Sequence, residues 1–359
     1  MTGESERLRQ PRATPGSGIG SGTGTKRAAN SLLGTAARLG GLVFAIALVM
    51  LFFAIKSDGL FLKTNNLLGL LRYMSSLAIV GLGLTAVLIV GEIDLSFGNL
   101  YGLSAMVAAV AWIEWEWSLW MAVLAAYAAA IAVGSFNAFF TAVVKIPSFV
   151  ATLGSSTLIL GFTLYVSNSN RYDPRYPPPG KPDVSSGELS FFRGLANQDL
   201  PGDLPMQVIW MTGIALAFWF ALRRSLFGFR LKAVGGNPVA ARLAGLPVMR
   251  YKWFAFLLVS VAAATAALLD FSYVASTAPD AGLTLLFPTF AAVIIGGASL
   301  QGGHGTVVGT LLGALLLAVI ANGLAVTAAG AFAQQMLLGF VTIGAVVLDQ
   351  FTQRWRANR

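Results

Sequence analysis

The chain has 359 residues, of which 56% are hydrophobic and only 11% are charged, and its net charge is +9. Soluble domains carry about 25% charged residues, so this composition excludes an ordinary water-soluble domain and predicts a membrane protein. The absence of Cys and the single His304 exclude disulfides and predict that the chain holds no metal.

The basic residues fall into three clusters, which argues against a nucleic-acid partner and for cytoplasmic segments under the positive-inside rule. These clusters are residues 1–38, 223–252 and 354–359. The first contains the low-complexity run PGSGIGSGTGTK, so we expect residues 1–38 to form a disordered cytoplasmic tail.

The remaining chain contains ten apolar segments, each close to the roughly 20 residues that a membrane-spanning helix needs. The third and eighth are short enough to be re-entrant. We therefore predict an all-α integral membrane protein with about ten transmembrane helices in a domain at 39–348. The segments are 39–55, 67–90, 97–113, 118–144, 147–167, 206–222, 253–274, 284–300, 306–326 and 331–348.

The loops between these segments set the expected orientation. The polar stretch 168–205 contains seven prolines and slightly more acidic than basic residues, so we place it outside. The loop 223–252 contains seven basic residues and no acid, so we place it inside. Ten spans then put both termini, including the tail 349–359, in the cytoplasm.

Two carboxylates interrupt the apolar sequence in the run GEIDLSFGNLYG. Acidic residues at membrane depth are costly and mark function by default. In one interpretation Asp94 caps the helix that follows. In the other, Glu92, Asp94, Ser96 and Asn99 line a hydrated translocation path and bind substrate hydroxyls. The sequence leaves both open.

Glycines near the C-terminus predict close helix packing. Gly305, Gly309 and Gly313 form a GxxxGxxxG row on one helix face, which lets membrane helices approach closely. The pairs Gly296–Gly297 and Gly302–Gly303 flank a turn and are expected to serve the backbone there.

The basic loop contains VGGNPVAARLAGL, at residues 234–246. Asn237 is a suitable N-cap and Pro238 a suitable first residue for a short helix that Gly245 ends. This helix is either an ordinary surface feature or a docking helix for a cytoplasmic partner. No phosphate-binding G-x-x-x-x-G-K-[ST] motif and no Ser-His-Asp set are present, so we expect neither nucleotide binding nor catalysis by this chain.

Three motifs together resemble the permeases of bacterial ABC importers for monosaccharides, the ribose, xylose and galactose group. They are GEIDLSFGNLYGLSA, GGNPVAARLAG and AAVIIGGASLQGGHGTVVGTLLGALLLAVIANGL. The resemblance runs from about residue 42 to residue 349, and VKIPSFVATLG is similar to the xylose branch.

The resemblance implies a type II ABC importer fold and a homodimer of permeases in the bacterial inner membrane. It implies that GGNPVAARLAG, with Gly235, Gly236, Asn237, Pro238, Ala240, Ala241, Arg242 and Gly245, is the coupling segment for a cytoplasmic ATPase. That ATPase would use ATP and Mg, while this chain binds no cofactor. A periplasmic or lipid-anchored binding protein would deliver the sugar, a pentose such as xylose or ribose.

One departure bears on the substrate. Family members commonly carry Glu-Leu-Asp before the AAxxxGG motif, whereas this chain has Phe287–Pro288–Thr289, so the sequence does not identify the sugar. The alternatives are an ABC permease for branched-chain amino acids or nucleosides, and an ion-coupled secondary transporter. The latter requires matching intramembrane charges in two repeats, which the sequence does not display.

Overall fold

The computed structural model describes residues 23–200, 204–327 and 330–357. The chain divides into two compact units, Met1–Gly41 and Leu42–Arg359. In the first unit the described residues form the opening turns of α1 (Thr23–Lys56). Within the tail expected at 1–38, residues 23–38 are thus helical in the structure, and their sequence is rich in the helix formers Ala, Leu and Arg. Residues 1–22 lie outside the described part.

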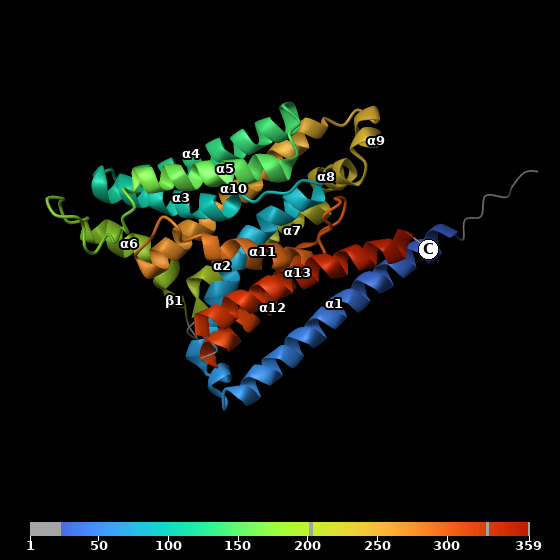
Figure 1. Cartoon of the computed structure of the whole chain (residues 1–359), viewed down its shortest axis with the longest axis horizontal. Helices are drawn as coiled ribbons and strands as arrows, with labels where there is room; N and C mark the ends of the chain where they lie inside the picture. The colour runs from blue at the N-terminus through green and yellow to red at the C-terminus, as the bar shows by residue number, and fades with distance from the viewer. Residues whose placement is uncertain (1–22, 201–203, 328–329, 358–359) are drawn as a thin grey trace, which may run out of the picture. The chain divides into compact units, whose positions relative to one another are not determined.

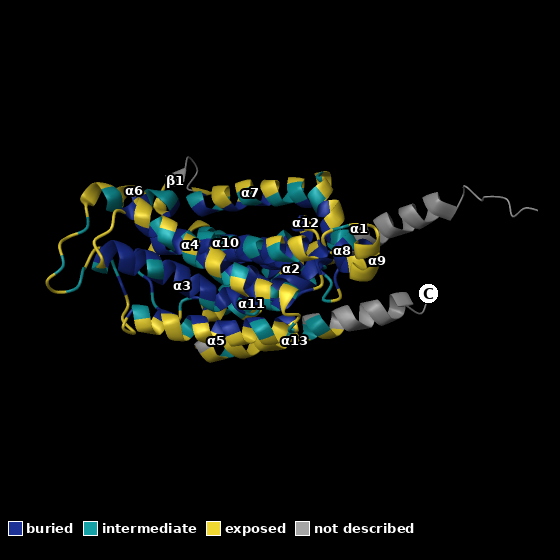
Figure 2. Ribbon diagram, turned by 90° about the horizontal axis from the view of Figure 1, so that it is seen from above, coloured by how far each residue is buried: buried dark blue, intermediate teal, exposed yellow. Residues whose placement is uncertain are grey.

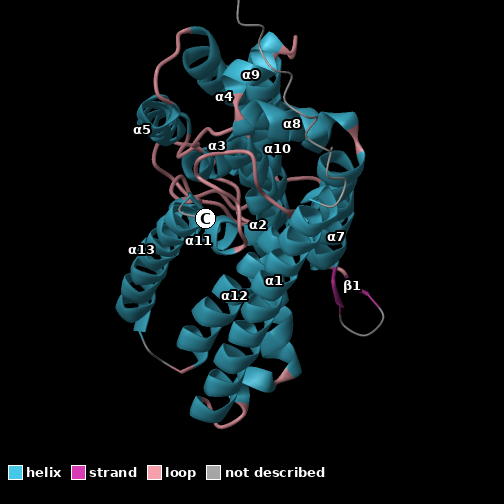
Figure 3. Cartoon of the chain, turned by 90° about the vertical axis from the view of Figure 1, so that its right-hand side faces the viewer, coloured by secondary structure: helices cyan, strands magenta, loops and turns pink. Residues whose placement is uncertain are grey.

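The second unit is built almost wholly of helices (Figures 1 and 3). The sheet in its described part is one short antiparallel pair, β1 (Asp199–Leu200) and β2 (Leu204–Pro205). The all-α fold class is thus confirmed. The helices are α2 (Thr64–Ile89), α3 (Phe97–Ala109), α4 (Leu119–Ala138), α5 (Ser148–Val166), α6 (Ser186–Asn197), α7 (Met206–Trp219), α8 (Leu226–Gly236), α9 (Pro238–Leu243), α10 (Val248–Val274), α11 (Leu283–Ile295), α12 (Val307–Val326) and α13 (Gly330–Ala357).

Eight helical segments of the described chain are long and apolar enough to cross a membrane. Single π-helical turns lengthen three of them, at Val110–Glu114 after α3, Phe139–Val143 after α4 and Phe220–Arg224 after α7. The other two of the ten expected segments are shorter apolar helices, Leu283–Ile295 and Phe332–Gly344. The first of these was expected to reach Leu300, but it ends at Gly296–Gly297, where Gly297 has φ 100.

The helices form an inner and an outer layer. The apolar windows of α2, α10 and α12 are each 67% buried, and that of the α3 segment is 89% buried. The windows of α4, α5 and α7 are no more than 28% buried. Figure 2 shows this as dark α2 and α3 against the largely yellow outer faces of α5 and α7. Exposed Leu and Phe on outer helices are normal for a chain solvated by lipid.

Glycines allow the inner helices to meet at their backbones. A Cβ at Gly309 would lie 1.8 Å from the carbonyl oxygen of Gly296, and one at Gly313 would lie 1.9 Å from that of Ala292. The GxxxGxxxG row thus lies directly against α11. Gly305, the first member of the row, faces α2 instead, since its Cβ would lie 2.8 Å from the Ile89 side chain.

The long polar stretch between α5 and α7 contains the helix α6, which we did not predict. Its Phe192 is buried between the rings of Trp112 and Phe271. Its Glu188 accepts hydrogen bonds from the indole of Trp112 at 2.9 Å and from the backbone N–H of Leu119 at 3.3 Å. These contacts attach α6 to the ends of three long helices.

Candidate functional site

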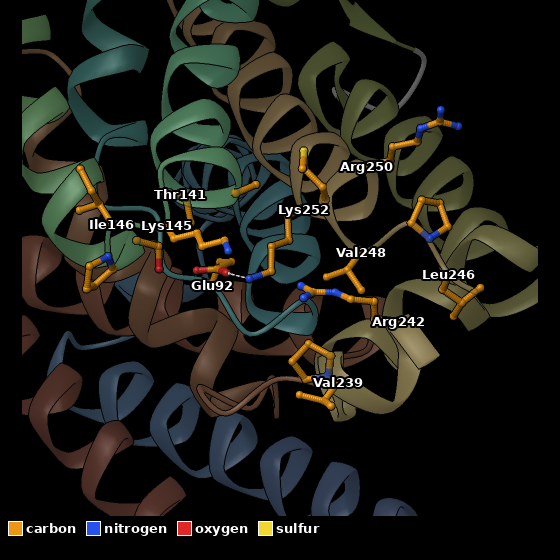
Figure 4. Close-up of a pocket in the computed structure, with 16 residues that line it drawn as sticks. Glu92, Thr141, Lys145, Ile146, Val239, Arg242, Leu246, Val248, Arg250 and Lys252 are labelled. Atoms are coloured by element: carbon orange, nitrogen blue, oxygen red, sulfur yellow. Dashed lines mark hydrogen bonds and ion pairs between the residues drawn. The ribbon is translucent and has the colours of Figure 1, made fainter. Parts of the chain in front are cut away.

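A cavity of about 810 Å³ opens beside α9. Figure 4 shows its wall, to which the π turn after α4, the segment between α2 and α3, α9 and the first turn of α10 all contribute. We call this the α9 cavity. Cationic side chains dominate its polar lining, because it includes Lys145, Arg242, Arg250 and Lys252 but a single acid, Glu92.

The one acid is paired. Lys252 at the start of α10 donates a hydrogen bond to Glu92 and forms an ion pair with it. Glu92 is 8% exposed, so the pair is held largely away from solvent. Figure 4 shows Lys145 and Arg242 pointing toward this pair from opposite sides. The ion pair thus ties the segment between α2 and α3 to the base of α10, next to α9.

The short helix α9 forms for the reasons that its sequence predicts. The Asn237 side chain accepts a hydrogen bond from the backbone N–H of Ala240 at 2.9 Å, and Pro238 occupies the first turn. Gly245 has φ 80 and follows the end of the helix. Ala241 is the buried residue of α9. Val239, which also lines the α9 cavity, is 69% exposed, and Leu243 is 85% exposed.

Three glycine-containing motifs that are far apart in the sequence meet directly behind α9. A Cβ at Gly235 would lie 1.7 Å from the Ile89 carbonyl oxygen, and one at Gly302 would lie 2.6 Å from the Gly235 carbonyl oxygen and 3.0 Å from the Gly91 Cα. The backbone N–H of Gly303 donates to the Ile89 carbonyl at 2.8 Å. We call this contact of residues 89–91, 235–236 and 302–303 the glycine junction. Gly236 differs from its neighbour, because nothing lies within 4 Å of its Cβ position.

The segment between α2 and α3 is a helix break whose polar groups are used locally. Asp94 is fully buried, and its Oδ1 accepts hydrogen bonds from the backbone N–H and the hydroxyl of Ser96, both at 2.7 Å. Asn137 of α4 donates to that hydroxyl, also at 2.7 Å. The N-cap residue of α3 is Ser96, which follows Asp94 by two residues. Asp94 thus fixes the turn that leads into α3.

Hydroxyl groups of α5 complete the break. Ser148 and Thr152 accept hydrogen bonds from the backbone N–H groups of Ile93 and Leu95, each at 3.0 Å. The side-chain amide of Asn99 donates to Ser156 at 2.9 Å. The four predicted path residues are close together in the sequence, but the structure does not arrange them around one opening. Glu92 alone among them lines the α9 cavity. Asp94 bonds to Ser96, while Ser96 and Asn99 bond to side chains of α4 and α5.

Sequence reasoning did not identify several residues of this region. Ser148, Thr152 and Ser156 recur every fourth residue on the mainly apolar helix α5, and this polar stripe was a usable signal. The pairing of Lys252 with Glu92, 160 residues apart, had no local signal. Groups of three or more His, Cys, Asp or Glu side chains that could hold a metal are absent from the described part of the chain.

The motifs that meet at the glycine junction lie within a region, residues 66–346, that matches the family described as "Branched-chain amino acid transport system / permease component". The chain belongs to this family. It is therefore a multi-pass membrane permease and not an enzyme, as expected. A permease component works with further components of its transport system, an ATPase and a substrate-binding protein.

Individual relatives agree with this assignment. The chain is 32% identical to the ribose import permease protein RbsC of Escherichia coli, over 82% of this chain and 88% of the relative. It is 29% identical to the xylose transport system permease protein XylH of E. coli, over 87% and 92%. It is also 32% identical to a probable ABC transporter permease protein, y4mJ, of Sinorhizobium fredii, over 88% and 90%. The resemblance to xylose and ribose permeases is thus confirmed.

Proposed function

We propose that this chain is the permease of an ATP-driven importer that carries a pentose, such as xylose or ribose, into a bacterial cell across the inner membrane. Two copies form the path, and both termini and α9 face the cytoplasm. The similarity to xylose and ribose permeases supports the substrate class. The basic loop that contains α9 supports the orientation.

The observation that carries the mechanism is the position of α9. This helix exposes Val239 and Leu243, while Gly235, three residues before its first residue, is packed against backbone in the glycine junction. Exposed apolar side chains on a short, capped and basic loop suit docking into a cleft of a protein partner. That partner is a cytoplasmic ATPase, which binds the ATP and Mg that this chain does not bind.

Movement of the ATPase would be transmitted to the membrane helices through two sets of direct contacts. The glycine junction joins α8 and α9 to the end of α2 and to the loop before α12. The Glu92–Lys252 pair joins α10 to the helix break. Rigid-body displacement of α9 therefore cannot occur without displacement of these elements, which is a known way of switching a bundle between states.

The proposal is tested with uptake and purification in the cells that express the whole transporter. We expect saturable uptake of D-xylose or D-ribose that is lost on deletion of the chain, and co-purification of an ATPase. Leu243→Asp should abolish both uptake and co-purification. Leu62→Asp is the matched control, because Leu62 is 51% exposed at the opposite end of α2 from the glycine junction.

Two results would contradict the proposal. Uptake of L-leucine with no uptake of either pentose would assign the substrate to the branched-chain amino acids in the family's description. Normal co-purification of the ATPase with Leu243→Asp would show that α9 is an ordinary surface helix.

A further inference from the structure

A second cavity, of about 670 Å³, lies between α2, α11, α12 and α13. Its polar and aromatic lining comprises Tyr73, Thr284, Phe287, Asn322, Gln334 and Gln335. Its other lining residues are aliphatic, Pro or Gly, so within the described part of the chain no Asp, Glu, Lys or Arg faces it. We call it the neutral cavity, in contrast to the cationic α9 cavity.

The neutral cavity lies toward the end of the bundle opposite to α9. Tyr73 precedes the C-terminus of α2, at Ile89, by 16 residues, or about 24 Å of helix at 1.5 Å per residue. Thr284 and Gln334 belong to the first turns of α11 and α13, and Asn322 to the last turns of α12. In the orientation proposed above, this is the side from which a substrate arrives.

The lining favours an uncharged, polyhydroxylated ligand. Each sugar hydroxyl is both a donor and an acceptor, and the amides of Asn322, Gln334 and Gln335 offer both functions. The rings of Tyr73 and Phe287 supply the apolar surface against which the C–H face of a sugar packs. A charged substrate such as an amino acid would enter a neutral wall without a partner for either charge, which is costly away from water.

Two local features fix polar groups on the wall. Asn322 and Asn66 exchange side-chain hydrogen bonds at 2.8 and 3.0 Å, which orients the Asn322 amide and leaves its second N–H and second lone pair for a ligand. Pro288 lies inside α11 and has no N–H, so the carbonyl of Thr284, four residues earlier, lacks its helical donor. Both Thr284 and Pro288 line the cavity.

We infer that the neutral cavity is where this chain receives the sugar, as a binding site for a neutral monosaccharide. The inference rests on the proposed function and deepens it, because it names the substrate-contacting residues. Those residues are on α2, α11, α12 and α13, whereas the candidate path residues that the sequence offered, Glu92, Asp94, Ser96 and Asn99, are at the Asp94 break.

The absence of Cys from the chain allows a direct test, because Gln334→Cys creates a single thiol. In cells with the complete transporter, we expect a membrane-impermeant methanethiosulfonate reagent to label this thiol. The pentose that the wild-type cells import should slow the labelling several-fold, whereas L-leucine should not. Gln198→Cys is the matched control, since Gln198 is exposed and does not line the cavity, so its labelling should be independent of sugar.

Uptake kinetics give a second measurement. Thr284→Val and Gln334→Leu should each raise the KM for the imported pentose several-fold with normal amounts of protein in the membrane. Thr157→Val, on the exposed side of α5, should leave KM unchanged. If the pentose is imported but neither slows labelling nor has an altered KM in these variants, the inference is overturned while the proposed function stands. If no pentose is imported, both fail.

Discussion

Individual glycines in this chain have sharply different roles although they lie side by side. Gly235 and Gly236 follow each other at the end of α8. The Cβ of any other residue at 235 would overlap the backbone of Ile89, whereas at 236 the space is open. Backbone atoms cannot rotate away as a flexible side chain can, so the overlap has to be relieved by moving α8 away from α2.

Gly235→Ala should therefore be much more harmful than Gly236→Ala. Overpacking a well-packed interior costs about 1–3 kcal/mol and occasionally more, and we expect the upper end of this range for Gly235→Ala because the contact is with backbone. Thermal unfolding of the purified protein in detergent, together with its yield, measures the difference. Equal melting temperatures for the two variants would show that the glycine junction is not packed as described.

The ion pair between Glu92 and Lys252 is a second residue-scale test. Loss of a charged hydrogen-bond partner in a poorly hydrated place costs about 1.5–3 kcal/mol, so Glu92→Gln and Lys252→Met should each destabilise the protein. The double variant should be less destabilised than the sum of the two, because neither charge is then left alone. Chemical or thermal unfolding of all four proteins completes the cycle.

A surface pair provides the control for this cycle. Arg175 and Asp173 form an ion pair in which the Arg175 side chain is 39% exposed. Such pairs contribute about 0–1 kcal/mol, so Asp173→Asn should have a small effect. Strict additivity of the Glu92 and Lys252 substitutions would mean that the two groups do not interact.

At the scale of helices, apolar runs and their caps were sufficient to predict most elements. Asn237 and Pro238 specified the start of α9 through purely local chemistry, and the structure has that cap. The sequence failed where an element depends on distant partners. The helix α6 has the amphipathic sequence SGELSFFRGLAN within a polar stretch, and the burial of its Phe192 between Trp112 and Phe271 could not be read from neighbouring residues. The sequence left two interpretations of Asp94 open for the same reason, because hydroxyl groups of α5 and Asn137 of α4 complete the hydrogen bonding of this break.

The dependence of the break on α5 predicts an effect of one hydroxyl. Thr152 is fully buried and accepts from the backbone N–H of Leu95. Thr152→Val keeps the shape but leaves that N–H without a partner, which costs about 1–3 kcal/mol. Thr157→Val removes a hydroxyl that bonds only within α5 at an exposed position, so it should be nearly neutral. The melting temperatures of the two variants in the same detergent test this prediction. Similar values would contradict the described role of α5.

At the scale of the whole second unit, the inner helices α2 and α12 form a closely packed pair that ends at the glycine junction. The Cβ of a residue replacing Gly81 would lie 3.1 Å from the Thr310 side chain. The hydroxyl oxygens of Thr85 and Thr310 are 2.6 Å apart and fully enclosed. Motifs predicted that α12 packs closely against another helix, but they did not predict its partners. The partners of α12 depend on which glycines face which backbone segments in the folded structure.

This close pairing leads to a prediction about transport. If α9 moves the bundle by rigid-body displacement, α2 and α12 should keep their contact through the cycle, because a tightly packed interface does not deform continuously. A disulfide between them should then permit transport. The variant Thr85→Cys/Thr310→Cys places two sulfur atoms where the hydroxyls now touch, in a chain that otherwise has no Cys. We expect oxidation to link α2 to α12 and pentose uptake to continue at a rate close to that of the reduced protein, with each single-Cys variant as control. Loss of uptake on oxidation, with recovery after reduction, would instead show that α2 and α12 separate during each cycle. The transport movement would then occur between two inner helices.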